Sequence, residues 1–150
     1  MKYQAVLFDM DGTVLDTLDD LCDSINHSLA EFSLPPVSRE HVRQCLGNGA
    51  AFLVSHSIPS DSGPELEANV LAFYKPWYDA HCLIKTAPYE GILPMMQSLK
   101  EHGLRLAIIS NKPDRAVQEP EKRGWKLRPP TVFRSWLLKK EIRSGQPPTV

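Results

Sequence analysis

The stretch that decides the fold is VLFDMDGTVLDT, residues 6–17. It begins as a short apolar run and ends at two aspartates, Asp9 and Asp11, that are separated by one residue. An apolar run of this kind, bounded by polar residues, is typical of a buried parallel strand. Ligands of open α/β sheets bind at the carboxyl ends of the strands, so the two aspartates are candidate site residues.

Helical periodicity follows this strand. Apolar residues recur every three or four positions from Leu18 to Phe32, which predicts an amphipathic helix that Pro35 and Pro36 end. A second helix is expected after Ser38, its predicted N-cap, and a third within residues 48–58. A longer helix is predicted within residues 63–83, where Pro76 is expected to kink or split it. Its predicted apolar face comprises Leu66, Val70, Phe73, Trp77 and His81.

Strand and helix signals then alternate again. Residues 91–103 carry Pro94 in a predicted first helical turn and Gly103 just past the predicted end. Residues 104–110, LRLAIIS, form a second apolar run that ends at Ser110. This order predicts an α/β fold, with an incomplete Rossmann-like parallel sheet as core and a helical cap inserted after the first strand. The expected division is core 1–15 and 84–118, cap 16–83, and an atypical tail 119–150.

Charge is distributed unevenly along the 150 residues. Residues 1–114 carry 8 Lys and Arg against 15 Asp and Glu, whereas residues 115–150 carry 9 against 3. The basic tail also holds five prolines, which favour loops, and disorder is one interpretation of it. No membrane span or secretory signal is recognisable. Three widely spaced cysteines, without a C-x-x-C pair, indicate reduced thiols of a cytoplasmic protein.

The acidic pair has a structural and a chemical interpretation. Asp9 could cap the following turn, with Asp11 and Gly12 as an ordinary turn pair. Alternatively, carboxylates at a strand end can attack phosphorus or transfer protons. Ser110 stands at the end of the second strand, and it could be an ordinary strand-end hydroxyl or a ligand of the same site.

The motif DMDGTVLDT, residues 9–17, resembles the first motif of the haloacid dehalogenase-like phosphohydrolases, D-x-D-G-T-[LV]-x-D-[ST]. IISNK, residues 108–112, is similar to the second motif of that family. The helical stretch between them resembles the small cap of the phosphoglycolate phosphatase and β-phosphoglucomutase branch, and bacterial phosphoglycolate phosphatase is most similar. The resemblance covers about residues 1–118.

The resemblance implies roles for several residues. Asp9 would be the nucleophile that forms an aspartyl-phosphate, and Asp11 the general acid and base. Mg²⁺ would bind the Asp9 carboxylate and the backbone carbonyl of Asp11. Three further groups are expected to bind phosphate or substrate. They are Gly12 and Thr13 in the turn, Ser110, Asn111 and Lys112 after the second strand, and Gly47, Asn48 and Gly49.

Two of those assignments keep an alternative. For Lys112 a solvated surface lysine is the favoured interpretation, and the Gly47–Gly49 segment is equally the turn that ends a helix. Asp16 and Thr17 are interpreted as hinge and helix cap of the insert. The five histidines show no ligand spacing and receive no role.

Two motifs that the family carries further on are missing. Downstream of Asp114 the acids are Glu119, Glu121 and Glu141, and none follows a glycine as in G-D-x-x-x-D. Lys139 and Lys140 lack the proline that usually follows the family lysine. We therefore hypothesise that the family sequence is truncated near residues 117–119 and that a shifted reading frame encodes the residues that follow. Weak or absent phosphatase activity is expected.

Other functions are compatible with the same motifs. A phosphomutase would use the same first motif, and a non-catalytic fragment could bind phosphate without turnover. A nucleic-acid binder using the basic tail is disfavoured, because no recognisable module is present there. The expected partner is a small phosphorylated metabolite, and missing strands would leave a sheet edge open to self-association.

Overall fold

The computed structural model describes residues 3–110 and 131–134 of the chain. It confirms the predicted α/β fold with a parallel sheet. The chain divides into two compact units. Unit 1 comprises Met1–Val14 and Pro88–Val150, and unit 2 comprises Leu15–Ala87.

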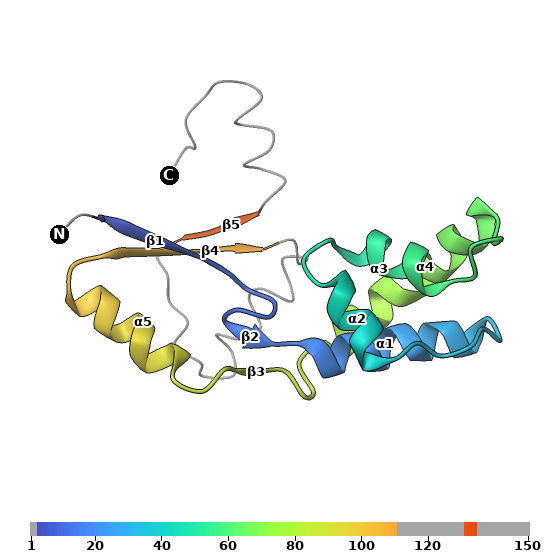
Figure 1. Cartoon of the computed structure of the whole chain (residues 1–150), viewed down its shortest axis with the longest axis horizontal. Helices are drawn as coiled ribbons and strands as arrows, with labels where there is room; N and C mark the ends of the chain where they lie inside the picture. Colours follow the sequence, from blue (N-terminus) through green and yellow to red (C-terminus); the bar gives the residue numbers. More distant parts are fainter. Residues whose placement is uncertain (1–2, 111–130, 135–150) are drawn as a thin grey trace, which may run out of the picture. The chain divides into compact units, whose positions relative to one another are not determined.

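Unit 1 contains a three-stranded parallel sheet. Its strands are β1 (Ala5–Asp9), β4 (Arg105–Ser110) and β5 (Thr131–Arg134), and β4 lies between the other two (Figure 1). Helix α5 (Ile92–Glu101) contacts β4, as predicted for residues 91–103. Gly103 follows that helix at φ +79°, a left-handed conformation that glycine adopts at little cost. Apart from β5, the predicted tail lies outside the described residues.

Strand β1 is parallel, as predicted, but it is not buried. Its residues alternate between exposed and half-buried, and Leu7 is 61% exposed. Among the described strands β1 pairs with β4 alone, through a register that runs from Ala5 opposite Arg105 to Asp9 opposite Ile109. Strand β1 has one described strand neighbour, whereas β4 has two. The residues Leu106, Ala107 and Ile108 of β4 are accordingly buried. The apolar composition of β1 therefore predicted its pairing correctly and its burial wrongly.

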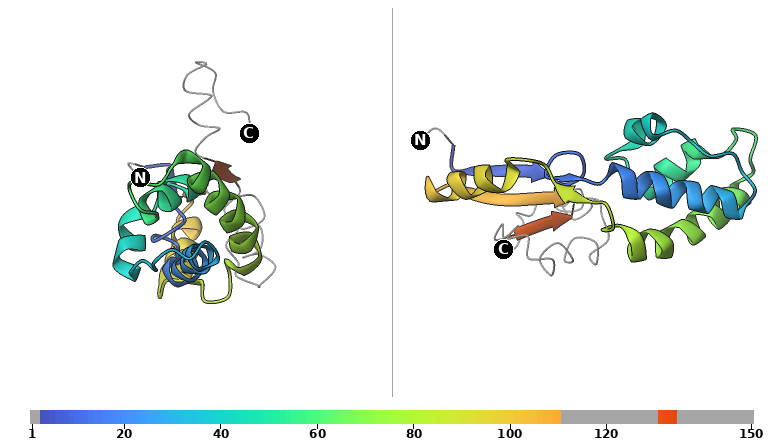
Figure 2. Two further views of the ribbon diagram at one scale, coloured as in Figure 1. Left: turned by 90° about the vertical axis from the view of Figure 1, so that its right-hand side faces the viewer. Right: turned by 90° about the horizontal axis from the view of Figure 1, so that it is seen from below.

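Unit 2 is built from four helices (Figure 2). They are α1 (Leu18–Glu31), α2 (Arg39–Cys45), α3 (Ala50–Ser57) and α4 (Pro64–His81). Helix α1 contacts the other three, and α2 also contacts α3, which contacts α4. Two short strands, β2 (Leu15–Asp16) and β3 (Ala87–Pro88), pair with each other. The Ser38 hydroxyl accepts a hydrogen bond from the His41 N–H at 3.1 Å, so the predicted N-cap of α2 is confirmed.

Pro76 does not split helix α4, and the buried face of the helix differs from the predicted one. It continues as one helix through Pro76, and its buried face comprises Val70, Tyr74 and Tyr78. The aromatic residues Phe73 and Trp77 are half-buried and stack on His27 of α1, with ring centroids 5.7 and 3.5 Å apart. The stack continues from Trp77 to His81 at 3.9 Å. These contacts lie on both sides of the proline and hold the helix together where one backbone hydrogen bond is lost.

The cysteines agree with the sequence analysis. All three are free; Cys45 and Cys82 are buried and Cys22 is half-buried. Within the described part of the chain, no helix is long and apolar enough to cross a bilayer.

Candidate active site

The end of β1 turns sharply around one backbone carbonyl. The Met10 carbonyl accepts hydrogen bonds from the N–H groups of Val14 at 3.0 Å and Thr13 at 3.4 Å. Gly12 has a φ of +77°, which explains why glycine occupies this point of the turn. Met10 and Val14 are 2% and 0% exposed, so their buried side chains anchor the turn. Sequence analysis assigned neither residue a function, although an apolar residue between two acids could have suggested an anchor.

The anchored turn leaves polar groups at its surface. Asp9, Gly12 and Thr13 are exposed, and Asp11 is half-buried. A compact turn with exposed backbone N–H groups can hold an anion, and nearby carboxylates can supply a nucleophile and a proton donor. The turn thus carries groups of the kinds that a phosphoester reaction can use.

Ser110 ends β4 at the same edge of the sheet. Because β1 and β4 are parallel and Asp9 is opposite Ile109, Ser110 is the next residue after the register partner of Asp9. It is 2% exposed. The backbone register therefore brings the carboxyl ends of both motif-bearing strands together, although about 100 residues separate them in the sequence.

The electrostatic environment of Asp9 opposes its ionisation. Partial burial of the carboxyl group raises the pKa of Asp9, and the neighbouring charge of Asp11 raises it further. A hydrogen bond with the Met10 backbone acts in the opposite direction and lowers this pKa in part. The charge of Asp11 disfavours ionisation of Asp9, so a cation bound here would stabilise the ionised Asp9 carboxylate.

Comparison with known proteins agrees with this arrangement. A family model described as "Haloacid dehalogenase-like hydrolase" matches residues 6–124, which include the β1 turn and the end of β4. The chain belongs to the haloacid dehalogenase-like hydrolase family.

Several curated members of the family are similar in sequence. Phosphoglycolate phosphatase 1 of Pseudomonas aeruginosa is 37% identical over 118 residues, which are 75% of this chain and 43% of that protein. N-acetylmuramic acid 6-phosphate phosphatase of the same organism is 36% identical over 119 residues, covering 79% and 52%. This chain therefore spans about half the length of the curated relatives it matches.

Solved structures of the family share the fold. A structure assigned as a phosphoglycolate phosphatase from Lactobacillus delbrueckii subsp. bulgaricus aligns with a TM-score of 0.83 and 28% identity. The alignment covers 98% of this chain and 75% of that one. A haloacid dehalogenase-like hydrolase structure from Bacteroides fragilis, at 17% identity, aligns with a TM-score of 0.81 and covers 97% and 75%. The second likeness concerns the fold alone.

The remaining predicted site residues of this family member belong to unit 2 or lie outside the described residues. Gly47, Asn48 and Gly49 belong to unit 2, between α2 and α3, and Gly47 and Gly49 have φ of +80° and +88°. The Asn48 N–H donates to the Cys45 carbonyl at 3.4 Å, so this segment does form the turn that ends α2. Asn111 and Lys112 lie outside the described residues.

The insert begins and ends with aspartate contacts. An Asp16 carboxylate oxygen accepts a hydrogen bond from the Leu18 N–H at 3.3 Å, whereas Thr17 occupies the N-cap position of α1 without a side-chain bond. Asp20 is a buried carboxylate that sequence analysis overlooked, because its partners are more than 60 residues further along the chain. No pattern within the helix distinguishes it from the neighbouring acids of the first turn.

Proposed function

We propose that the chain carries the nucleophilic half of a phosphatase site that hydrolyses a small phosphorylated metabolite, such as phosphoglycolate. The observation that carries the proposal is the parallel register of β1 and β4, which brings Asp9 and Ser110 together at the carboxyl ends of the two strands. Unit 1 would be the catalytic core and unit 2 the cap that selects the substrate. The cytoplasmic location stays a prediction.

The proposed reaction has two steps, the formation of an aspartyl-phosphate and its hydrolysis. An Asp9 carboxylate oxygen attacks phosphorus, the bond from phosphorus to the ester oxygen breaks, and Asp11 gives a proton to the departing oxygen. Asp11 then removes a proton from water, which attacks the aspartyl-phosphate, releases inorganic phosphate and restores the Asp9 carboxylate. The Ser110 hydroxyl and the backbone N–H groups near Gly12 and Thr13 would hold the phosphoryl oxygens.

The donor set of the turn fits Mg²⁺. It offers the Asp9 carboxylate and the Asp11 backbone carbonyl, and Mg²⁺ typically binds one or two carboxylates together with waters and substrate phosphate. The described residues contain no group of three or more His, Cys, Asp or Glu side chains that could hold a metal alone. When bound, Mg²⁺ would neutralise charge on the phosphoryl group. Partial burial is the main cause of the raised pKa of Asp9 and the charge of Asp11 adds to it, so a cation at this position would favour the ionised nucleophile.

We further propose that activity in this chain is impaired. Each missing electrostatic group, the lysine and the distal acid pair, is expected to cost about 10²–10³ in rate. The chain, which covers 43% of one relative and 52% of another, has no Lys-Pro and no G-D-x-x-x-D beyond Asp114, and this absence supports the proposal. The short match also keeps the alternative of a non-catalytic phosphate-binding fragment, which would bind phosphate without turning over an ester.

A turnover assay tests the function. The full chain is incubated with Mg²⁺ and either phosphoglycolate or N-acetylmuramic acid 6-phosphate, beside the Pseudomonas aeruginosa phosphoglycolate phosphatase 1. We expect slow hydrolysis, at least about 10²-fold below that enzyme, which Asp9→Asn and chelation of Mg²⁺ abolish. Hydrolysis that persists in Asp9→Asn would contradict the assignment of the nucleophile, and a rate equal to that of the relative would contradict the impairment.

Self-association through the sheet edge is also proposed. Tyr3 and Leu7 on and beside β1 are 69% and 61% exposed, and exposed apolar residues on an edge strand favour strand pairing between chains. We expect sedimentation velocity to show species larger than the monomer as concentration rises, and Leu7→Lys to reduce them. A wild-type chain that stays monomeric at every concentration would contradict this proposal.

A further inference from the structure

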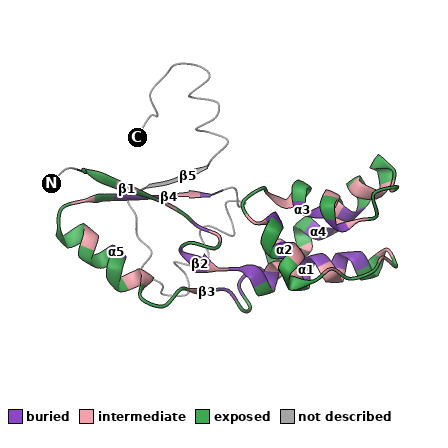
Figure 3. Ribbon diagram, in the orientation of Figure 1, coloured by how far each residue is buried: buried purple, intermediate pink, exposed green. Residues whose placement is uncertain are grey.

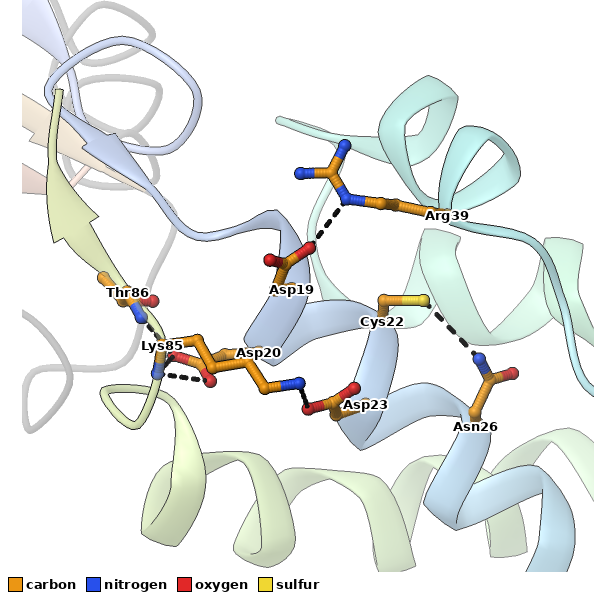
Figure 4. A network of polar contacts seen from close by, with 8 residues as sticks. All are labelled: Asp19, Asp20, Cys22, Asp23, Asn26, Arg39, Lys85 and Thr86. Atoms are coloured by element: carbon orange, nitrogen blue, oxygen red, sulfur yellow. Dashed lines mark hydrogen bonds and ion pairs between the residues drawn. The ribbon is translucent and has the colours of Figure 1, made fainter.

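The side chain of Asp20 binds the backbone of a segment that is distant in the sequence. The carboxylate lies in the first turn of α1 and is part of a residue that is 3% exposed. It accepts hydrogen bonds from the Lys85 N–H, at 2.9 and 3.1 Å to its two oxygens, and from the Thr86 N–H at 2.8 Å (Figure 4). A buried carboxylate is stable only where hydrogen bonds replace its water shell, so this geometry is strongly constrained.

Exposed ion pairs surround this buried contact. The Lys85 ammonium group pairs with Asp23 at 2.6 Å, and Arg39 at the start of α2 pairs with Asp19 at 2.7 Å (Figure 4). Their side chains are all more than half exposed, and exposed pairs contribute little to stability. The attachment of residues 85–86 to α1 therefore depends on Asp20 rather than on the ion pair of Lys85.

The Asp20 contact lies where the chain enters and leaves unit 2. Unit 2 begins at Leu15, just before α1, and ends at Ala87, just after Thr86. Asp20 therefore joins the segment that enters unit 2 to the segment that leaves it. Without this contact the two segments would be separate connections, each with its own conformational freedom.

We propose that Asp20 is a positioning residue that acts as a clamp. Its carboxylate holds residues 85–86, where the chain leaves unit 2, against the first turn of α1, where the chain enters it. The clamp fixes the course of residues 85–86, rather than adding general stability to the helices. This inference goes beyond the proposed function, because it depends on contacts within unit 2 alone. It predicts a local effect, at two named backbone amides, when the carboxylate is removed.

Hydrogen–deuterium exchange on the full chain tests the clamp. In Asp20→Ala, the amides of Lys85 and Thr86 should exchange about 10-fold to 100-fold faster than in the wild type. Asp20→Asn should give a smaller increase, because its amide oxygen still accepts a hydrogen bond. The matched control is Asp23→Asn, which removes only the exposed ion pair and should change both rates by less than about twofold.

Exchange in the helices separates a clamp from a general stabilising role. The clamp predicts that interior amides of α1 and α4, such as those of Ile25 and Val70, keep their protection in Asp20→Asn. Unchanged exchange at residues 85–86 would overturn the proposal, and so would an equal loss of protection throughout unit 2. If Asp20→Ala does not fold, the isosteric Asp20→Asn decides between these outcomes.

Limited proteolysis gives a second readout. Trypsin cleaves after lysine, and the bond between Lys85 and Thr86 must detach from α1 before it can be cut. We expect cleavage of this bond, followed by mass spectrometry, to be at least about 10-fold faster in Asp20→Ala than in Asp23→Asn. Equal rates would contradict the clamp. Neither readout uses catalysis, so a failure of turnover at Asp9 leaves this test intact.

Discussion

Units 1 and 2 bury their apolar residues to different degrees (Figure 3). In the helices of unit 2, Ile25, Leu29, Val42 and Val70 are all 0% exposed, whereas in the sheet of unit 1 the strand β4 is largely buried but Leu7 of β1 is 61% exposed. Unit 2 is continuous in sequence, and its helices contact one another after short connections. The sheet of unit 1 instead pairs residues about 100 positions apart. The difference teaches that helices adjacent in sequence close the core of unit 2, whereas the candidate chemistry lies in unit 1, where β4 is buried and β1 is largely exposed.

The largest effect should come from opening the core of unit 2. Leu29→Ala removes a fully buried side chain and is expected to lower the free energy of unfolding by about 2–5 kcal/mol. The matched control is Leu7→Ala in unit 1, where the exposed side chain should contribute less than about 1 kcal/mol. Urea unfolding measures both values. Similar losses in the two variants would show that β1 is covered in solution and would remove the contrast between the units.

A moderate effect is expected at the start of α2. Ser38→Ala removes the hydroxyl that accepts from the His41 N–H at 3.1 Å, and loss of an N-cap typically costs about 0.5–2 kcal/mol. The variant should unfold at lower urea concentration with an unchanged slope. Ser38→Asp supplies another capping oxygen and should restore most of the stability. A Ser38→Ala chain as stable as the wild type would indicate that α2 is held by its contacts with α1 and α3 alone.

The smallest effect concerns the charge of Asp9 in unit 1. Because its pKa is raised in the folded chain, Asp9 ionises less readily there than in the unfolded chain. Its contribution to stability is present below the ordinary pKa of an aspartate and is lost as the pH rises through the raised value. Asp9→Asn should therefore increase the free energy of unfolding at about pH 7 by less than about 1 kcal/mol, since the residue is exposed.

Measurement at two pH values checks this sign. At about pH 3 the wild-type carboxyl is protonated in both states, so the two chains should unfold at the same urea concentration. A loss of stability in Asp9→Asn at neutral pH would contradict the predicted direction. The experiment also establishes whether the variant is folded, which the turnover assay requires.

The sequence predicted features that depend on local contacts. The N-cap at Ser38, the helix from Ile92 to Glu101 and the strand that ends at Ser110 follow from short-range patterns, and the structure confirms them. Features set by distant contacts were predicted less well. The burial of β1 depends on which elements cover it, and the partners of Asp20 lie 65 and 66 residues away.

The face of α4 failed for a different reason. Phe73, Tyr74, Trp77 and Tyr78 are all aromatic, so the helical period alone cannot decide which pair points into the core. The sequence favoured Phe73 and Trp77, whereas Tyr74 and Tyr78 are buried. The stack on His27 explains why the other pair remains at the contact with α1. For the candidate site, the acidic turn could be predicted from its motif, but the proximity of Ser110 required the strand register.

The most direct test of the account is whether Asp9 accepts a phosphoryl group. Beryllium fluoride imitates that group when it binds an aspartate carboxylate, so the full chain is incubated with it and Mg²⁺ and followed by fluorine NMR. The account predicts one bound fluoride species in the wild type that is absent from Asp9→Asn. A folded wild-type chain that binds no beryllium fluoride, or an Asp9→Asn chain that still binds it, would contradict the central claim.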